Sequence, residues 1–546
     1  MKDINSVEKN KFNGYFWIFG GLLCILLISI MARDINRHFT GLHSWADAHG
    51  PWQARVQVKY GFGYTKGLYT WAVGDPPTEN PSRYIDHPQL TGLINAAFMA
   101  VFGINRWALR AENLVATVVT LLLFLKILRG LLDEKTALLA GLFFCMFPLI
   151  GYFGIYMWLY PLAFWAIWCY LVLINGLRDG PEAASIHKLG LAAGLFFGLQ
   201  MNWEGLFFAM AIGVHYIFRC VYRRKFPDVT MLAILVIAPL SSMIVNFAIM
   251  AAGHGWDFQR ILELYKWRAG SGEMQQHNWA KWFAQLWEHA VTNFSLPVLI
   301  VAIAYLTFGQ ILIFMSGAAK KTAANAVRRF PHFWFFIMPA VFQLFLLKGC
   351  LWKHQTWERP LMLPVAIAAA LGIMLLSDVL VKVRPLLAKI TTVSIIFIIT
   401  ISCAKGLNNY YSITHFSPEK VKLFTMLNES IPPDRMLLSF ETLKVEQHKA
   451  KGSHYRPEIA WYLDREVVQA TTLSEIQKYA QTGKFPYYLM PGTYYSREAS
   501  EYLAKLSSEL QKRYKMTYIP QDPGGPGKAP MLPYLIFDLN SRVSGS

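Results

Sequence analysis

Residues 90–128 read LTGLINAAFMAVFGINRWALRAENLVATVVTLLLFLKIL, and this stretch decides the topology of the chain. Its second part, residues 106–128, is long and apolar enough to cross a bilayer, which takes roughly 17–25 residues. Its first part, residues 90–104, is apolar over only 15 residues, a length that favours an interfacial or re-entrant helix. Whether this first part crosses decides on which side of the membrane every later loop lies.

Apolar runs of similar length recur along the first 404 residues. The chain has 546 residues, of which 54% are hydrophobic, 15% aromatic and only 16% charged. This composition excludes soluble, disordered, collagen-like and disulfide-scaffold proteins, and it predicts a polytopic α-helical membrane protein. Eleven transmembrane helices are predicted, at residues 14–31, 106–128, 136–153, 158–177, 189–201, 205–221, 229–252, 292–316, 331–349, 360–381 and 389–404.

The basic residues decide between the two topologies. If residues 90–104 do not cross, the basic clusters that follow the predicted spans lie on the side of the N-terminus. Because cytoplasmic loops carry an excess of Lys and Arg, this arrangement predicts a cytoplasmic N-terminus and an outer C-terminus. The net charge of +18 is divided among these short clusters and forms no continuous stripe, so no nucleic-acid partner is predicted.

The tail of the chain is predicted to be a separate domain. Residues 405–546 lack long apolar runs and show the alternation of a small soluble α/β domain. The chain is therefore predicted to divide into a transmembrane catalytic domain at 1–404, which includes the outer loop 32–105 with its interfacial helices, and a periplasmic domain at 405–546. Within the tail, strands are predicted at 436–440, 487–491, 515–519 and 534–539, and an amphipathic helix at 496–514.

Three carboxylates outside the spans are candidate catalytic residues: Asp34 and Asp47 in the first outer loop and Glu204 in the turn 201–204. A carboxylate just outside a span, beside a groove that lipid enters, is placed to deprotonate an acceptor hydroxyl. Glu204 lies between two apolar runs, where a charge is costly unless it has a partner or faces a cavity. The alternatives are that the aspartates contact water or cap helices, and that Glu204 is an ordinary surface carboxylate.

A basic patch is predicted at the outer end of two spans, in the loop 350–359. This loop is predicted to lie on the outer side, whereas basic residues are usually enriched in cytoplasmic loops. It nevertheless contains Lys353, His354 and Arg359. Such side chains bind phosphate, Arg as a bidentate fork and Lys as a point charge. The alternative is contact with the headgroups of ordinary anionic lipid.

Two other features of the outer loops bear on chemistry. The loop 253–291, which contains Arg268, is amphipathic and is expected to lie on the membrane, where it can close over a site as a lid. His43 and His49 with Asp47 leave a divalent metal open, although their spacing matches no strong ligand motif. The chain has no Walker A motif, no serine-hydrolase elbow and no dinucleotide-binding glycine pattern, so no certain cofactor is predicted.

The order of these features resembles the GT-C superfamily of integral-membrane glycosyltransferases that use lipid-phosphosugars. Within it, the chain resembles the protein O-mannosyltransferase and aminoarabinose (lipid A) transferase type, glycosyltransferase family 39. The resemblance extends over the whole architecture, from the long first outer loop to the α/β domain after the last span. The motifs that carry it are His43–Asp47 with Ala54–Arg55, Tyr84–Leu90, Val101–Arg110 and His354–Pro360.

The resemblance implies an inverting transfer of a sugar from a polyprenyl-phosphate donor in the membrane lipid to a hydroxyl of a glycan, lipid or protein. The implied base is a first-loop aspartate. The family usually has an acidic pair here, but Ala48 follows Asp47 and Ser44 stands where related sequences can have Asp, so Asp34 competes with Asp47 for this role. The side chains implied in donor binding are Arg55, Asp86, His87, Arg268, Lys353, His354 and Arg359.

Two other classes of function stay open. A transporter or flippase of lipid-linked saccharides would tend to show internal repeats and midplane charges, whereas this chain has no repeat and concentrates its polar groups at one face. A non-catalytic assembly or sensor protein would retain its function without Asp47 and Asp34. Because none of the six cysteines forms a CxxC pair or a disulfide pattern, the membrane is expected to be a bacterial inner membrane.

Overall fold

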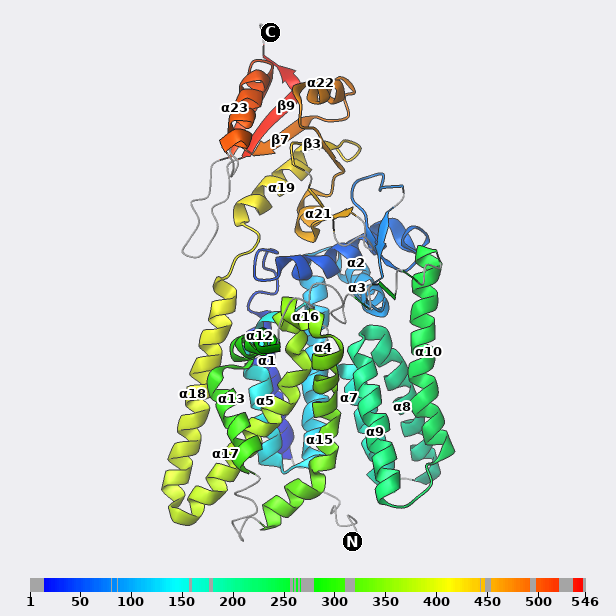
Figure 1. The fold of residues 1–546 in the computed structure, drawn as a ribbon, viewed down its shortest axis with the longest axis vertical. Coiled ribbons are helices and arrows are strands. Elements are labelled where there is room, and N and C mark those ends of the chain that lie inside the picture. Colours follow the sequence, from blue (N-terminus) through cyan, green and yellow to red (C-terminus); the bar gives the residue numbers. More distant parts are fainter. Residues whose placement is uncertain are drawn as a thin grey trace.

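The computed structural model of the chain is a helical bundle with a layer of shorter elements across one end and a mixed sheet beyond it (Figure 1). The residues it describes are 14–79, 81–85, 87–156, 160–175, 180–255, 279–309, 320–441, 443–446, 453–491, 497–519 and 534–543, with four single positions between 259 and 266. All structural statements below concern these residues.

The long elements of the bundle run roughly along its axis (Figure 1). They are α1 (Gly14–Ala32), α4 (Arg106–Leu131), α5 (Glu134–Met146), α7 (Pro161–Asn175), α8 (Gly180–Met201), α9 (Glu204–Tyr222), α10 (Val229–His254), α13 (Leu296–Ala304) with η3 (Tyr305–Gly309), α15 (Lys320–Leu346), α17 (Met362–Val383) and α18 (Pro385–Ser412). The end of the bundle that faces the C-terminal sheet is called its outer end (Figure 1). The shorter elements near this end are α6 (Pro148–Phe153), α12 (Trp279–Phe294), α16 (Lys348–Lys353) and η4 (Gln355–Leu361).

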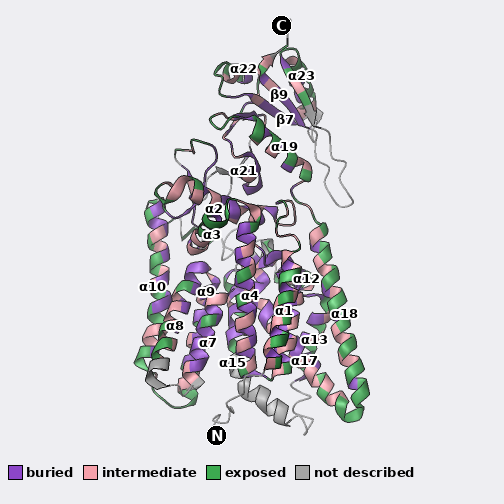
Figure 2. Cartoon of the chain, turned by 180° about the vertical axis from the view of Figure 1, so that it is seen from behind, coloured by how far each residue is buried: buried purple, intermediate pink, exposed green. Residues whose placement is uncertain are grey.

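Helix α4 forms the centre of the bundle, whereas α10 and α18 expose much of their surface (Figure 2). Its buried residues lie on several faces, as expected for a helix surrounded by other helices. The helix begins at an N-cap, where the Asn105 side chain accepts a hydrogen bond of 2.9 Å from the backbone N–H of Ala108. This start places Arg110, in the first turns of α4, at the outer end of the bundle.

The eleven predicted spans can be compared with the helices of the described residues. Among the described residues, six helices are long and apolar enough to cross a membrane, or seven if one bent pair counts as a single span. The protein is thus a helical membrane protein, but the number of eleven is not confirmed. Two of the predicted spans are interrupted, and the breaks have identifiable causes.

The predicted span 136–153 breaks at Pro148 into α5 and α6. Phe147, the residue before this proline, has extended backbone angles (φ −56°, ψ 127°), because a following proline disfavours the helical conformation. The predicted span 292–316 breaks at Ser295, where α12 meets α13 at a bend of 108°. Ser295 has a positive φ of 69°, and Pro297 follows in the first turn of α13.

A layer of short elements lies across the outer end of the bundle (Figure 1). It consists of α2 (Ser44–Thr65), the antiparallel pair β1 (Tyr69–Trp71) and β2 (Ser82–Tyr84), and α3 (Leu90–Phe102). Helix α3 has 13 residues, which is too short to span, as the length of the apolar run 90–104 predicts. Its Thr91 hydroxyl donates to the carbonyl of Met201 at 2.8 Å, which joins the layer to the end of α8.

The C-terminal unit, the described residues from Pro418 to Val543, is built around a five-stranded sheet of order β6-β3-β7-β9-β8. β3 is parallel to β6 and β7, whereas β9 is antiparallel to β7 and β8. The four predicted strands and the predicted helix are confirmed, as β3 (Leu437–Ser439), β7 (Tyr487–Pro491), β8 (Tyr514–Ile519), β9 (Tyr534–Arg542) and α23 (Arg497–Gln511). The remaining elements are α19 (Pro418–Ser430), β4 (Lys444–Glu446), β5 (Ser453–Tyr455), α21 (Pro457–Leu463), β6 (Val467–Gln469) and α22 (Leu473–Gln481).

Candidate functional site

A buried ion pair joins the first outer loop to the centre of the bundle. Asp47, in the first turn of α2, accepts two hydrogen bonds from Arg110 of α4: Nε to Oδ1 at 3.2 Å and Nη2 to Oδ2 at 2.7 Å. The Arg110 side chain is fully buried and that of Asp47 is 1% exposed. Burial of two charges in this way is tolerated because the geometry is bidentate and the charges cancel.

Arg110 also shapes the segment that follows α1. Its Nη1 donates to the backbone carbonyls of Asp34, Ile35 and Arg37, at 3.4, 3.1 and 2.7 Å. The guanidinium of Arg37 in turn lies 3.6 Å from Asp47 Oδ2 and stacks over the ring of Tyr152 at 4.3 Å. Asp47 is therefore held between two guanidinium groups.

Asp34 lies on the same segment but in a different environment. Its side chain is half-buried, and within the described part of the chain its carboxylate takes part in no hydrogen bond or ion pair. The two competing aspartates thus differ: Asp47 is buried and paired, whereas the Asp34 carboxylate has no such partner.

A second buried ion pair lies at the outer ends of α9 and α15. Glu204, which begins α9, has an unexposed carboxylate whose Oε1 accepts hydrogen bonds from Arg359 Nη2 at 3.1 Å and Gln343 Nε2 at 2.7 Å. The predicted turn carboxylate therefore points inward, and the predicted phosphate ligand Arg359 is its partner. A cation beside it is what a buried Glu in an apolar run requires.

Tyr156, in the turn after α6, has a buried hydroxyl close enough to Asp47 and Arg359 to interact with their charges. Burial raises its pKa well above the usual value, and the neighbouring Tyr152 and Asp47 act in the same direction. Arg359 is also within electrostatic range of this hydroxyl. The buried Tyr156 hydroxyl has no hydrogen-bond partner among the described residues. A polar ligand placed between the ion pairs would satisfy it.

Three histidines converge beside these ion pairs. The ring of His43, the N-cap of α2, lies 5.6 Å from the ring of His354 and 6.3 Å from that of His415, centroid to centroid. The backbone N–H of His43 donates to His415 Nδ1 at 3.3 Å. Burial, followed by the charges of His354, His415 and His289, lowers the pKa of His43 to about 3.

The other predicted donor-binding residues have varied positions. His87 is half-buried and stacks on Trp357, with 6.1 Å between ring centroids. Asp86 and Arg268 lie outside the described residues, as does the side chain of Lys353.

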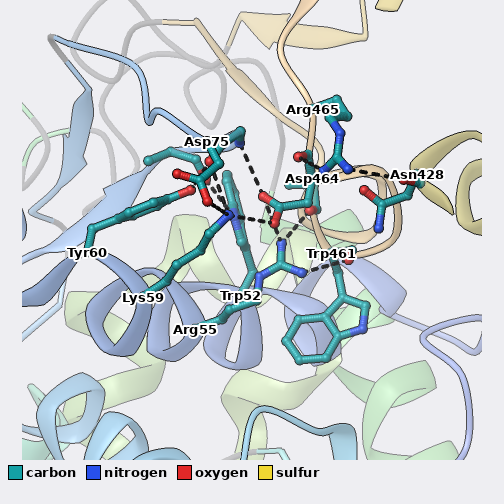
Figure 3. Close-up of polar contacts among 12 residues, drawn as sticks. Trp52, Arg55, Lys59, Tyr60, Asp75, Asn428, Trp461, Asp464 and Arg465 are labelled. Carbon is teal, nitrogen blue, oxygen red and sulfur yellow. Dashed lines mark hydrogen bonds and ion pairs between the residues drawn. The ribbon is translucent and has the colours of Figure 1, made fainter. Parts of the chain in front are cut away.

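Arg55 lies in an interface with the C-terminal unit (Figure 3). Its guanidinium donates to the carbonyls of Trp461 at 2.8 Å and Ala460 at 2.5 Å, near the end of α21, and lies 3.6 Å from Asp464. Lys59, one turn further along α2, lies 3.2 Å from the same carboxylate. These contacts hold α21 against α2.

This docking brings a carboxylate of the C-terminal unit to the start of α2. Glu458 of α21 is fully buried, and its Oε1 accepts from the hydroxyl of Ser44 at 2.7 Å and from Arg456 at 2.9 Å. Sequence reasoning missed Glu458, Arg110, Arg37 and His415. Only Arg110 had a signal, since a charge within a predicted span points to a buried partner.

The proposed metal site can be compared with the geometry. Among the described residues, no group of three or more His, Cys, Asp or Glu side chains is arranged to hold a metal ion. The rings around His49 are aromatic: Trp45 stacks on it at 4.8 Å and Tyr84 lies at 4.9 Å.

Comparison with solved structures defines the class of fold. The chain is similar to ArnT from Cupriavidus metallidurans, with a TM-score of 0.58 and 12% identity over 96% of this chain and 98% of that one. The structure of the same protein bound to undecaprenyl phosphate matches with a TM-score of 0.59 and 12% identity, over 98% and 99% of the two chains. The Archaeoglobus fulgidus oligosaccharyltransferase matches with a TM-score of 0.56 and 11% identity, over 93% and 74%.

The fold is therefore the one shared by ArnT and the archaeal oligosaccharyltransferase. Residues 86–245 also match the family described as dolichyl-phosphate-mannose-protein mannosyltransferase. Together these matches confirm the resemblance to the O-mannosyltransferase and ArnT type. No curated protein sequence matches the chain. At 11–12% identity the solved structures define the fold, and the reaction has to be argued from the site.

Proposed function

We propose that the protein transfers a sugar from a polyprenyl-phosphate donor to an acceptor hydroxyl at the outer face of a membrane. The observation that carries this proposal is the presence of two buried ion pairs, Asp47–Arg110 and Glu204–Arg359, together with a buried Tyr156 hydroxyl that has no hydrogen-bond partner among the described residues. Charged groups fixed in a site with little water stabilise developing charge far better than they do in water. A GT-C fold and a structural neighbour that binds undecaprenyl phosphate support the donor class.

The proposed reaction is a single displacement with inversion. The acceptor oxygen attacks the anomeric carbon from the face opposite the phosphate, the bond from that carbon to the phosphate oxygen breaks, and the acceptor proton passes to a carboxylate. Polyprenyl phosphate leaves as a stable anion, so it needs cations more than a strong acid. His87, His354 and Arg359 are proposed to contact it, with Lys353, Arg268 and the polar Asp86 completing this group.

Asp47 and Asp34 are the two proposed bases, and their environments separate their roles. The carboxylate oxygens of Asp47 are engaged by two guanidinium groups, those of Arg110 and Arg37. Asp34 has no such partner among the described residues, but only its backbone carbonyl contacts the ion-pair network. Arg55 is assigned a structural role in this proposal, because its donors are directed at carbonyls of α21.

We further propose that the chemistry takes place on the periplasmic side of a bacterial inner membrane. The C-terminal unit and the candidate site lie at the same end of the bundle, whereas the turns α4–α5 and α17–α18 lie at the other end (Figure 1). These turns carry basic residues such as Arg129, Lys382 and Arg384, a pattern that supports a cytoplasmic location for them.

The test is a transfer assay with detergent-purified protein, a panel of radiolabelled polyprenyl-phosphate sugars and membrane extract as acceptor. Wild type is compared with Asp47→Asn, Asp34→Asn and, as an exposed control, Asp434→Asn, after each variant is shown to be folded. Loss of the base is expected to reduce the rate by about 10²–10⁴-fold, with the control unchanged. If wild type releases polyprenyl phosphate from no donor, the proposal fails, and lipid-flipping assays would test the transporter alternative.

A further inference from the structure

Three separate parts of the chain contribute the histidines beside the candidate site. His43 comes from the first outer loop, His354 immediately precedes η4, and His415 follows the end of α18. His354 and His415 are exposed and His43 is half-buried, so none of the three side chains is fully enclosed by the protein. No local sequence pattern relates these positions, and only the tertiary structure brings the rings of His354 and His415 to 5.6 and 6.3 Å from the ring of His43.

The backbone around His43 is fixed in an uncommon conformation. His43 has φ 56° and ψ 36°, in the left-handed region that residues with a side chain seldom adopt. Such conformations persist where the surroundings maintain them, often at ligand sites. Among the described residues no hydrogen bond to the His43 ring is found. His415 Nδ1 accepts a hydrogen bond from the backbone N–H of His43. The neutral His415 ring therefore carries its proton on Nε2, and this nitrogen can donate to a ligand.

The surroundings of His43 and His415 disfavour the charged form of both rings. Burial and the neighbouring His354, His415 and His289 lower the pKa of His43 to about 3. Burial, followed by the cation Arg456, also lowers the pKa of His415, whereas Glu458 acts in the opposite direction. His289 Nδ1 in turn lies 3.8 Å from Glu358 Oε1. A phosphate among the rings adds negative charge and therefore favours their protonated form.

We infer that His43, His354 and His415 form an anion site for a phosphate group and that the site takes up protons when phosphate binds. The inference rests on the proposed function where the phosphate is that of a lipid-linked donor or its polyprenyl-phosphate product. Free inorganic phosphate offers the same chemistry, and the experiment separates the two sources. Phosphate binding then changes the protonation state of these histidines. In the proposed reaction a carboxylate of the candidate site also accepts the proton of the acceptor hydroxyl.

The experiment is titration calorimetry on the full chain in detergent, with undecaprenyl phosphate as the probe. Measurements at pH 7.5 in two buffers of different ionisation enthalpy give the number of protons taken up. Wild type is expected to take up about one proton per bound lipid, and its affinity to rise as the pH falls from 8 to 7. Undecaprenol, which lacks the phosphate, is expected to give no uptake, and inorganic phosphate to bind more weakly than undecaprenyl phosphate.

The variants are His43→Asn and His415→Asn, with His187→Asn as the matched control. Asn tolerates the left-handed conformation and caps helices, so His43→Asn preserves the start of α2. His187 lies near the start of α8, at the end of the helix away from Met201. Each site variant is expected to weaken binding by about tenfold or more and to reduce proton uptake, while the control does neither.

Two outcomes would overturn the inference: proton uptake and affinity unchanged in both site variants, or wild type that releases protons on binding. Equal affinity for undecaprenyl phosphate and inorganic phosphate would assign the site to free phosphate and remove its link to the donor. The assay requires no turnover, so its failure is separable from that of the proposed function. Proton-linked binding without transfer would retain the site and reject the enzyme.

Discussion

Arg110 donates to both oxygens of Asp47, with Nε at 3.2 Å from Oδ1 and Nη2 at 2.7 Å from Oδ2. The same guanidinium donates to three carbonyls of the segment between α1 and α2. One side chain from the central helix therefore fixes both the candidate carboxylate and the chain that leads to it. Removing it should affect stability as well as activity.

The first prediction concerns this ion pair. Arg110→Met leaves the buried carboxylate of Asp47 with only the more distant Arg37, and the expected loss of stability is about 3–5 kcal/mol, toward the lower end because Arg37 remains. Thermal unfolding in detergent measures it. The double variant Asp47→Asn/Arg110→Met should recover part of the loss, because no uncompensated charge remains. A double variant as unstable as the sum of the two single variants would contradict this account.

The second prediction concerns Glu204 and Arg359. Because they share a buried hydrogen bond of 3.1 Å, Glu204→Gln and Arg359→Gln should be coupled in a double-mutant cycle by about 1–3 kcal/mol. The exposed pair Lys512–Glu509 is the matched control, and its cycle should show no measurable coupling. Additive effects of Glu204→Gln and Arg359→Gln would mean that the pair does not form in solution.

The third prediction concerns the contact between α2 and the C-terminal unit, which Figure 3 shows. Arg55→Ala removes two hydrogen bonds to carbonyls of α21 and the ion pair to Asp464, each contact with a charged group being worth about 1.5–3 kcal/mol. The C-terminal unit should separate from α2 more often, and limited proteolysis between α18 and α19 should be at least about tenfold faster. Lys512→Ala, within the unit but away from α2, should leave the cleavage rate at the wild-type value. Equal rates for Arg55→Ala and wild type would show that other contacts suffice.

The fourth prediction concerns pH. In the folded protein the pKa of His43 is about 3, compared with 6.5 for the unfolded side chain, so below pH 6.5 the unfolded chain binds a proton that the folded chain does not. Stability should therefore be full above pH 6.5 and fall with decreasing pH, by up to about 1.4 kcal/mol per unit for this group. His38 and His415, whose pKa values are also lowered, act with the same sign. Unfolding temperatures from pH 7.5 to 5.5 should decline less in His43→Asn, and parallel curves would contradict the assignment.

Sequence patterns predicted much of the fold because their signals are local. The alternation in residues 487–491 predicts a strand, and β7 is found there; the 15-residue run at 90–104 is too short to span, and α3 is a helix of 13 residues. The predicted span 136–153 is divided into two helices, because a hydropathy count does not register the break that Pro148 introduces.

The candidate site was predictable only in part. Asp47 and Glu204 stand out as carboxylates between apolar runs, but their partners Arg110 and Arg359 are 63 and 155 positions away along the chain. Arg55 is the opposite case. An arginine in the first outer loop was predicted to bind phosphate, but in the structure its guanidinium donates to carbonyls of α21. A side chain's type indicates what it can bind, but not what lies opposite it.

By itself, the sequence determined that this chain is a helical membrane protein whose tail folds as an α/β unit. The length of apolar runs, the asymmetry of charge and the alternation within strands involve residues close together in the chain, so they can be recognised from the sequence alone. The tertiary structure alone decided that Asp47 lies between two arginines, that Glu458 of the tail contacts Ser44, and that three histidines meet at the start of α2. These relations depend on which helices pack together, and packing is settled by the whole bundle at once.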